Sequence, residues 1–218
     1  MKLRCSHRRN HALTLVEVLV VAIVIALLAM VFFPHTEPRA RAKFARIICI
    51  NNLKQISLAY RIWEGDHGDK YPMSVSVTNG GVMEILNQST WMIHLVMSNE
   101  LSTPKILFCP ADTDHLPATD FSTGFSAQNI SYFIGLDADE KDPQALLSGD
   151  DNFAIGGVPV KSGLLNVTTN TSITWTATRH HFAGNVALAD GSVQQMTNPG
   201  LTNWLRQTGV VTNRLAIP

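Results

Sequence analysis

Residues 11–34 read HALTLVEVLVVAIVIALLAMVFFP, and this stretch decides how the rest of the chain is arranged. The run from 13 to 33 is 21 residues long, and its only charged side chain is Glu17. At about 1.5 Å per residue, a helix of that length spans roughly 31 Å, close to the ~30 Å hydrocarbon core of a bilayer. We therefore predict a transmembrane helix over residues 13–34.

The segment ahead of this helix is short and basic. Residues 1–12 contain no acid and four basic side chains, which are Lys2, Arg4, Arg8 and Arg9. Because short basic segments stay in the cytoplasm, we predict that residues 1–12 form a cytoplasmic basic leader. The chain is then a single-pass inner-membrane protein, and the residues after Pro34 lie in the periplasm.

Glu17 needs an explanation, because a carboxylate buried in a membrane costs several kcal/mol unless it is paired. A secretory signal peptide has an apolar region of only about 7–15 residues, shorter than the run here. A plain signal anchor fits the length but leaves Glu17 unexplained. If the chain is cut between Ala12 and Leu13, Glu17 becomes the fifth residue of the mature chain. In a helical stack of subunits, the new amino group of one subunit can then pair with Glu17 of the next.

The stretch from Ala12 to Pro34 resembles the class III prepilin signal of type IV pilins and type II secretion pseudopilins. That signal has a small residue, a hydrophobic residue, Thr, two aliphatic residues and Glu ahead of an apolar helix, and residues 13–17 match it. The resemblance implies that a prepilin peptidase cleaves the Ala12–Leu13 bond and methylates the amino group of Leu13. It also makes Glu17 an assembly residue. Two positions depart from the family, which commonly has Gly before the cut and Phe or Met after it.

Residues 39–66, RARAKFARIICINNLKQISLAYRIWEGD, show a helical pattern of their own. One apolar stripe recurs at steps of three and four residues and consists of Cys49, Leu53, Ile56, Tyr60 and Trp63. We predict an amphipathic helix over residues 35–65, continuous with the transmembrane helix and kinked at Pro34 and Pro38. The stripe is interpreted as the spine of a small domain, with a lipid surface or a partner helix as the alternatives.

Residues 66–218 are expected to form a globular antiparallel-sheet domain. Strands are predicted over residues 105–108, 130–134, 145–147, 172–177, 185–189 and 192–196, and short helices over residues 89–101 and 199–209. Asp190-Gly191 is the two-residue turn of a hairpin. The predicted fold is α+β and pilin-like: a long N-terminal helix, with a transmembrane half and an amphipathic half, packed on a small antiparallel β-sheet.

A second resemblance extends along the chain. The segment CINNLKQISLAYRIWEGDHGDKYP resembles the one that follows the prepilin signal in a group of envelope proteins similar to the major pseudopilin. That group often ends with His, nine residues and Asp-Gly, and His180 with Asp190-Gly191 has this spacing. The implied partners are a prepilin peptidase that is also the methylase, other pilin-like subunits in a homo- or hetero-polymer, an inner-membrane assembly platform and membrane lipid.

The three cysteines, Cys5, Cys49 and Cys109, show no CxxC motif and no Cys/His pairing at zinc-ligand spacing. Removal of the leader leaves Cys49 and Cys109 as an even pair. In an oxidising compartment they are expected either to form a disulfide or to remain two separate buried thiols.

Acidic side chains gather in DADEKDPQALLSGDDN, residues 137–152. Calcium prefers clustered carboxylates and carbonyls, and the two ends of this segment can meet across a hairpin. The candidate calcium ligands are Asp137, Asp139, Asp150 and Asp151. The alternative is a set of solvated surface acids, since the calcium motif of major pseudopilins does not align with them. No other cofactor is expected.

No catalytic residues are assigned. His180 and His181, with Asp190 and Ser192, suggest an anchored hydrolase, but no G-x-S-x-G motif and no phosphate-binding loop accompanies them. The sequence therefore favours a protein that is not an enzyme.

The predicted function is that of a structural pilin-like subunit, assembled through its N-terminal helix into a type II secretion pseudopilus or a type IV pilus-like filament. The alternative is a membrane-anchored module that binds a glycan in the periplasm. It rests on tryptophans that are able to stack on sugars, which are Trp63, Trp91, Trp175 and Trp204. Nucleic acid is not an expected partner, because no basic-aromatic module follows the basic stretch.

Overall fold

The computed structural model describes residues 14–32, 38–86, 89–122, 124–208 and 210–218. The chain separates into two compact units, Met1–Ala40 and Arg41–Pro218. The predicted leader, the predicted cleavage site at Ala12 and Leu13, and the predicted kink at Pro34 lie outside the described residues.

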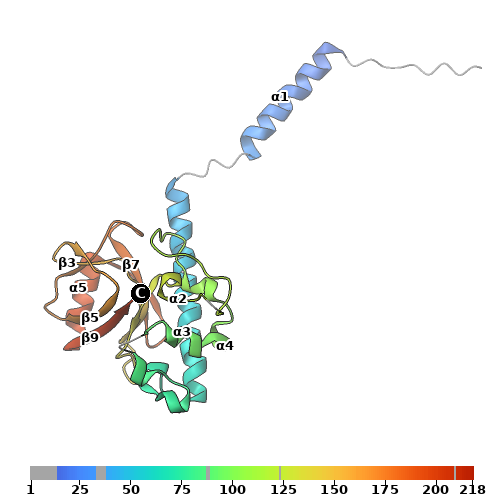
Figure 1. The fold of residues 1–218 in the computed structure, drawn as a ribbon. Helices are drawn as coiled ribbons and strands as arrows, with labels where there is room; N and C mark the ends of the chain where they lie inside the picture. Colours follow the sequence, from blue (N-terminus) through green and yellow to red (C-terminus); the bar gives the residue numbers. More distant parts are fainter. Residues whose placement is uncertain (1–13, 33–37, 87–88, 123, 209) are drawn as a thin grey trace, which may run out of the picture. The chain divides into compact units, whose positions relative to one another are not determined.

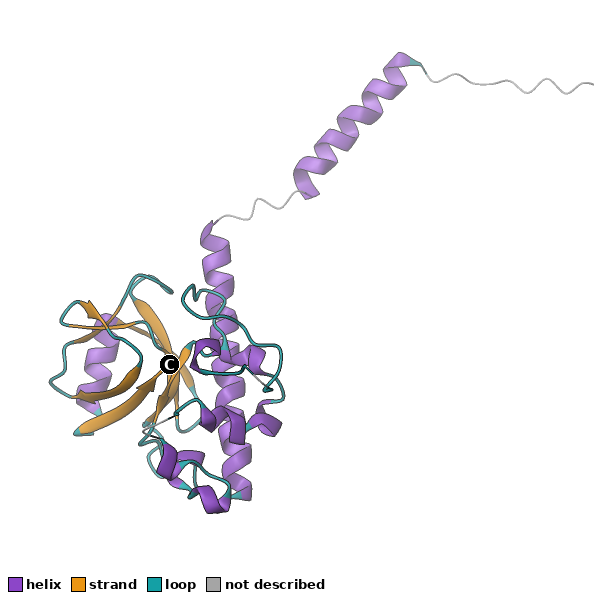
Figure 2. Cartoon of the chain, viewed as in Figure 1, coloured by secondary structure: helices purple, strands orange, loops and turns teal. Residues whose placement is uncertain are grey.

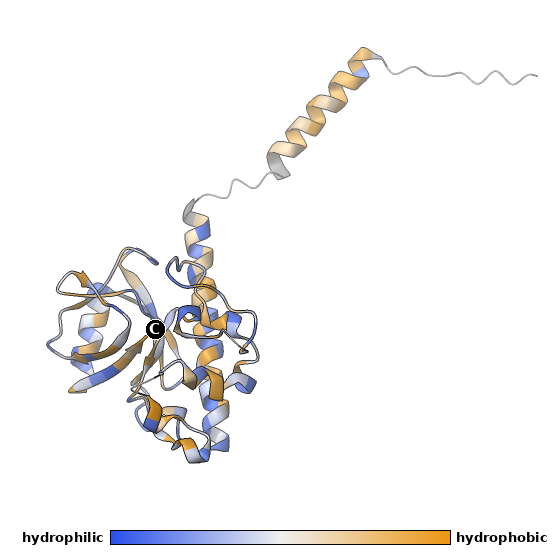
Figure 3. Cartoon of the chain, viewed as in Figure 1, coloured by the Kyte–Doolittle hydropathy of each residue, from blue (hydrophilic) through white to orange (hydrophobic). Residues whose placement is uncertain are grey.

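The first unit contains helix α1 (Leu15–Phe32), which is mostly apolar and has one acid, Glu17, in its first turn (Figure 3). Twelve of its described large apolar side chains are exposed, from Leu15 at 81% to Met30 at 74%. Among the described residues, no helix has both the length and the apolar character needed to cross a membrane.

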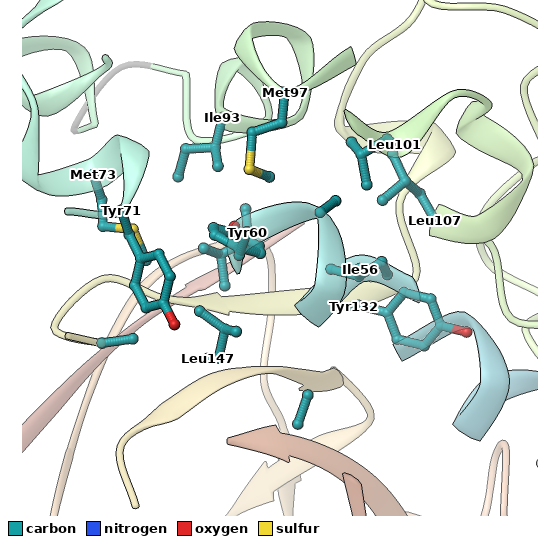
Figure 4. Close-up of a cluster of buried hydrophobic side chains, with 14 of the residues drawn as sticks. Ile56, Tyr60, Tyr71, Met73, Ile93, Met97, Leu101, Leu107, Tyr132 and Leu147 are labelled. Carbon is teal, nitrogen blue, oxygen red and sulfur yellow. The ribbon is translucent and has the colours of Figure 1, made fainter. Parts of the chain in front are cut away.

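The second unit is built around helix α2 (Pro38–Asp66). The predicted apolar stripe lies inside the protein, since none of its five side chains is more than 2% exposed. The stripe forms one core with short helices that follow α2 in the chain. Figure 4 shows Tyr60 of α2 between Ile93 and Met97 on one side and Leu147 on the other.

Short helical segments connect α2 to the sheet. They are the α-helices α3 (Met92–Val96) and α4 (Ser98–Leu101) and the 3-10 helices η1 (Pro72–Ser74), η2 (Val77–Asn79), η3 (Met83–Ile85), η4 (Pro104–Leu107) and η5 (Ala127–Asn129). The helix predicted over residues 89–101 is therefore divided at Met97. The strand predicted over residues 105–108 is wrong, because Thr103 caps η4 by accepting a hydrogen bond from the Lys105 N–H, and Pro104 favours a first helical turn.

Within the described residues, six antiparallel strands form the main sheet. In spatial order they are β5 (Gly163–Thr168), β9 (Thr212–Ile217), β1 (Tyr132–Gly135), β2 (Leu146–Asp150), β7 (Ala183–Leu188) and β8 (Val193–Thr197). The predicted hairpin is confirmed in its strands, because β7 pairs with β8, but its turn has three residues instead of the predicted two. The Leu188 N–H donates to the Ser192 oxygen, and the Gly191 N–H donates to the Leu188 oxygen, with Gly191 at a positive φ of 83°. The α+β class and the small antiparallel sheet are thus confirmed.

The two faces of this sheet are covered by different helices (Figures 1 and 2). Alternate residues of β1 show the division, because Tyr132 and Ile134 belong to the core on the α2 side, while Phe133 belongs to a second core. The second core also contains Leu201 and Leu205 of α5 (Asn198–Gln207). Strands β1, β2, β7 and β9 each contribute buried residues to both cores.

A second antiparallel sheet, β4 (Val158–Pro159), β3 (Phe153–Ile155) and β6 (Ile173–Trp175), lies at the end of β2. The aromatic rings of Phe153 and Trp175 stack with their centroids 4.5 Å apart. Strands β3, β4, β5 and β9 were not predicted. Strand β5 is a largely exposed edge strand, and its composition therefore lacks the alternation that marks a half-buried strand.

Candidate functional site

Both ends of the His-x9-Asp-Gly motif are attached to α2. The guanidinium of Arg46 donates a hydrogen bond to the backbone oxygen of His180. Arg61 donates one to the backbone oxygen of Asp190 over 3.2 Å, and the Tyr71 hydroxyl donates to the Ala189 oxygen over 3.0 Å. Strand β7 lies between these attachment points. The nine residues between His180 and Asp190 therefore span β7, and α2 binds the chain just before and just after this strand.

The side chain of His180 is buried beneath this strand. Its Nε2 atom lies 3.6 Å from the Cys109 sulfur and 3.5 Å from Oδ2 of Asp150. The residue is 2% exposed, and it lies in the turn that leads from β6 into β7. Burial lowers the pKa of His180 to about 4, with help from the positive charges of Arg46 and Arg179. The imidazole is therefore neutral near pH 7.

The cysteine beside this ring is bonded to α2. Cys49 and Cys109 form a disulfide whose Cα atoms are 5.4 Å apart. Cys109 also begins a tight turn, in which the Asp112 N–H donates to its backbone oxygen over 2.9 Å. Asn52, one turn further along α2, donates to the Phe108 oxygen over 2.9 Å. Of the two states expected from the sequence, the structure therefore has the disulfide, which joins α2 to the loop after η4.

Asp150 completes the cluster. The backbone N–H and the side-chain amide of Asn185 donate to its Oδ2 over 2.7 and 2.9 Å. Its other oxygen, Oδ1, is buried and has no hydrogen-bond partner among the described residues. Burial raises the pKa of Asp150 to about 7, against the lowering effect of the Asn185 N–H.

Four potential metal ligands thus converge from separate parts of the fold. They are Cys49 and Cys109, with Asp150 and His180, and one ligand atom from each lies within 4.8 Å of the others. All four side chains are buried. Within the described part of the chain, this is the one such group of His, Cys, Asp or Glu side chains.

A buried ion-pair network lies next to this cluster and centres on Arg179. Its guanidinium lies 2.7 Å from Oδ2 of Asp112 and 2.5 Å from Oδ1 of Asp151, and it donates to the Ser131 backbone oxygen. His115 Nδ1 lies 2.8 Å from Oδ2 of Asp112. Arg179, in the turn before β7, thereby contacts the loop after Cys109 at Asp112, the end of β2 at Asp151 and the start of β1 at Ser131.

The carboxyl of Asp112 is ionised in this network. Burial raises its pKa, but the hydrogen bond from His115 and the charge of Arg179 outweigh burial and hold the pKa well below its usual range. The hydrogen bond to Asp112 in turn raises the pKa of His115 above 6.5, with a smaller contribution from the charge of Asp151. The two groups therefore stabilise each other's charged forms.

The candidate calcium ligands are not gathered into one group. Asp137 pairs with Arg214 through three hydrogen bonds of 2.5–2.8 Å, and Asp139 accepts a hydrogen bond from the backbone N–H of Lys141. Asp150 and Asp151 are buried in the two clusters described above. Each of the four aspartates thus has a protein partner of its own.

The residues that suggested a hydrolase have different roles in the structure. Asp190 accepts a hydrogen bond from the Ser192 backbone N–H over 2.8 Å, which closes the hairpin turn. His181 is exposed and has a positive φ of 52°.

The tryptophans that suggested sugar stacking lie inside the protein: Trp63, Trp175 and Trp204 are buried, and Trp91 is half-buried.

Glu17 lies at the other end of the chain, in the first turn of α1. Its Oε2 accepts hydrogen bonds from the backbone N–H and the hydroxyl of Thr14 over 2.8 and 3.0 Å. The Glu17 N–H donates back to the Thr14 hydroxyl oxygen over 3.3 Å. This is the reciprocal arrangement of a capping box, so the acid also has a local partner.

The sequence did not identify Arg46, Arg61 or Arg179 as site residues. Each binds groups at least 28 residues away, and no local pattern signals such a contact. Comparisons with protein-family models, with curated proteins and with solved structures found no match to this chain. The function proposed below therefore rests on the chain's own residues.

Proposed function

We propose that this chain is a structural pilin-like subunit, a pseudopilin. A prepilin peptidase cleaves it between Ala12 and Leu13 and methylates the new amino group of Leu13. The mature subunit is then assembled through its N-terminal helix into a type II secretion pseudopilus or a type IV pilus-like filament. Residues 13–34 anchor it in the inner membrane before assembly, and the globular domain lies in the periplasm.

The observation that carries this proposal is the position of Glu17. It is the only charge among residues 13–33, and it is the fifth residue after the proposed cut. The apolar side chains around it are exposed, and each gains about 1.5–3 kcal/mol when it is fully buried. Lipid before assembly, and neighbouring helices after it, provide that burial. An acid in such a helix is tolerated when a cation pairs with it, and the amino group of the next subunit is that cation.

A feature of α2 supports assembly between copies of the chain. Opposite its buried stripe, α2 carries exposed apolar side chains, and these are Phe44, Ile47, Leu58 and Ile62. At about 100° per residue, the four fall within roughly 60° of each other around the helix. The stripe that faces the protein core is already buried. This second, exposed stripe is therefore the surface of α2 that a neighbouring subunit contacts in the filament.

The experiment is an analysis of the mature N-terminus. The full chain is produced with a prepilin peptidase, extracted from the membrane and examined by intact mass and by mass spectrometry of its N-terminal peptide. The expected product begins at Leu13 and carries a methylated amine. Ala12→Gly, which matches the residue common in the family, should be processed at least as well, and Ala12→Leu should remain uncut. A chain that still begins at Met1, or that begins after Ala42, would contradict the proposal.

A further inference from the structure

We infer that reduction of the Cys49–Cys109 disulfide converts the buried cluster beneath β7 into a zinc site, with Asp150 and His180 as the other two ligands. This inference stands apart from the proposed function, because no ligand lies in residues 1–40. Loss of either proposal leaves the other intact.

The donor set suits zinc. Two thiolates, one imidazole nitrogen and one carboxylate oxygen are all common zinc ligands, and four of them make a closed, structural type of site. In a tetrahedral zinc site with Zn–S of about 2.3 Å and Zn–N of about 2.0 Å, a sulfur and a nitrogen ligand lie about 3.6 Å apart. The Cys109 sulfur and His180 Nε2 are 3.6 Å apart.

A second distance also fits, and one distance has to change. Two oxygen or nitrogen ligands of tetrahedral zinc lie about 3.4 Å apart, and His180 Nε2 is 3.5 Å from Oδ2 of Asp150. The two sulfurs, which are bonded in the oxidised chain, have to separate to about 3.8 Å. Cys109 lies in a loop after η4, so it is the cysteine that is able to move relative to α2.

The orientation of His180 distinguishes a metal site from a catalytic one. In a Cys-His-Asp nucleophile system, one ring nitrogen faces the sulfur and the other faces the carboxylate. In this cluster a single nitrogen, Nε2, faces both the Cys109 sulfur and the Asp150 carboxylate. The groups therefore converge on one point in space, as ligands do around an ion.

The surroundings hold these ligands in place. Asn185 fixes the Asp150 carboxylate with two hydrogen bonds to Oδ2, and Oδ1 of the same carboxylate has no partner among the described residues. Arg46 binds the backbone oxygen of His180. Supporting contacts of this kind fix the ligand orientation in known metal sites. The unpartnered Oδ1 also gives the ion a second oxygen to approach.

The conversion requires a reductant, which we take to be a dithiol. The dithiol gives two electrons and two protons to the Cys49–Cys109 bond and becomes a disulfide itself, and the chain then holds two thiols. Zinc binding releases both thiol protons, together with any proton held by Asp150. The site then has a net charge of minus one, beside the cation of Arg46. The disulfide ties α2 to the loop after η4 in the oxidised chain, and the zinc ion ties both of them to β2 and to the turn before β7 in the reduced chain.

The experiment uses the full chain in detergent micelles, with Cys5→Ser to remove the third thiol. The protein is reduced with a phosphine and titrated with Co2+ under anaerobic conditions, and Zn2+ is then added as a competitor. We expect one Co2+ per chain, the intense visible absorption of tetrahedral thiolate-bound cobalt, and its loss when zinc is added. The oxidised protein should bind no Co2+.

A matched pair of variants tests the ligand assignment. His180→Asn should weaken cobalt and zinc binding by at least about tenfold, the scale on which metal sites respond to lost contacts. His181→Asn, at the exposed neighbouring position, should bind as the parent does, and Asn tolerates the positive φ there. Equal binding by both variants would overturn the assignment, as would binding that does not require reduction.

Folding is followed in the same samples by circular dichroism and by the alkylation of Cys49 and Cys109. If the reduced chain loses structure and zinc restores it, the result supports the site, because metal binding is then coupled to folding. Zinc should also protect both cysteines from alkylation. A reduced chain that takes up no metal, whether folded or unfolded, overturns the inference.

Discussion

Thr14 and Glu17 hold each other at the start of α1: the glutamate accepts two hydrogen bonds from the threonine and donates one back. This contact gives the acid a role within a single chain, because it satisfies groups at the helix N-terminus. The proposed pairing with the amine of a neighbouring subunit is a second role. Local capping needs a hydrogen-bond acceptor, whereas pairing with a cation needs a negative charge, so substitutions are able to separate the two.

We expect Glu17→Gln and Glu17→Ala to be inserted and cleaved largely as the parent is, and to assemble poorly. Glutamine keeps the shape and the capping acceptor but loses the charge, so the amine of each added subunit would enter the bilayer unpaired. Thr14→Val weakens the cap, at a cost of about 1 kcal/mol, and should still assemble. Assembly is measured by crosslinking between subunits, with the variants and the parent compared at equal amounts of protein in the membrane. Normal assembly of Glu17→Gln would show that the charge is not an assembly contact.

The disulfide should be a large contributor to the stability of the second unit. Cys49 and Cys109 are separated by 60 residues, and closing such a loop stabilises by about 4 kcal/mol on the chain-entropy model. We expect the double variant Cys49→Ala/Cys109→Ala to lose most of this in denaturant unfolding with a chelator present. Cys5→Ser is the control and should unfold as the parent does. A loss below about 1 kcal/mol would mean that the loop is already held by its other contacts.

Arg179 and Arg214 offer a comparison of a buried and an exposed ion pair. The side chain of Arg179 is 3% exposed and pairs with Asp112 and Asp151, whereas that of Arg214 is 58% exposed and pairs with Asp137. Arg179→Met should cost about 3–5 kcal/mol, because it leaves buried carboxylates without a partner. Arg214→Met should cost less than about 1 kcal/mol. If both variants lose the same free energy of unfolding, measured by heat or denaturant, Arg179 is not the centre of the network.

The pair of His115 and Asp112 should make stability depend on pH. The pKa of His115 is raised in the folded chain by its hydrogen bond to Asp112, so its contribution is fully present below about pH 6.5 and is lost as the pH rises through the raised pKa. We expect His115→Gln to cost about 1.5–3 kcal/mol near pH 6 and clearly less near pH 9. Unfolding across this range gives the profile. In an Asp112→Asn background the effect of His115→Gln should no longer depend on pH, and its persistence there would show that His115 acts through another group.

Local patterns in the sequence were sufficient for those elements that are stabilised by near neighbours. The stripe from Cys49 to Trp63 predicted a helix with one buried face, because side chains three and four residues apart share a face. Asp190-Gly191 predicted the β7–β8 hairpin, because this dipeptide between two strand patterns marks a tight turn, although the turn that forms has three residues, Ala189 to Gly191. The same kind of pattern failed at residues 105–108, where a single capping threonine converted an apolar run into η4.

What the tertiary structure alone decided is the cluster around His180. The sequence has no CxxC and no Cys/His pair at ligand spacing, and on that basis it excluded a zinc site. Cys49, Cys109, Asp150 and His180 are far apart in the chain, yet packing of α2 against the sheet brings them within 4.8 Å. Periodicity reports only which face of an element is buried. Which buried polar groups then meet depends on how whole elements pack, because a fold satisfies its buried polar groups through partners distant in the sequence.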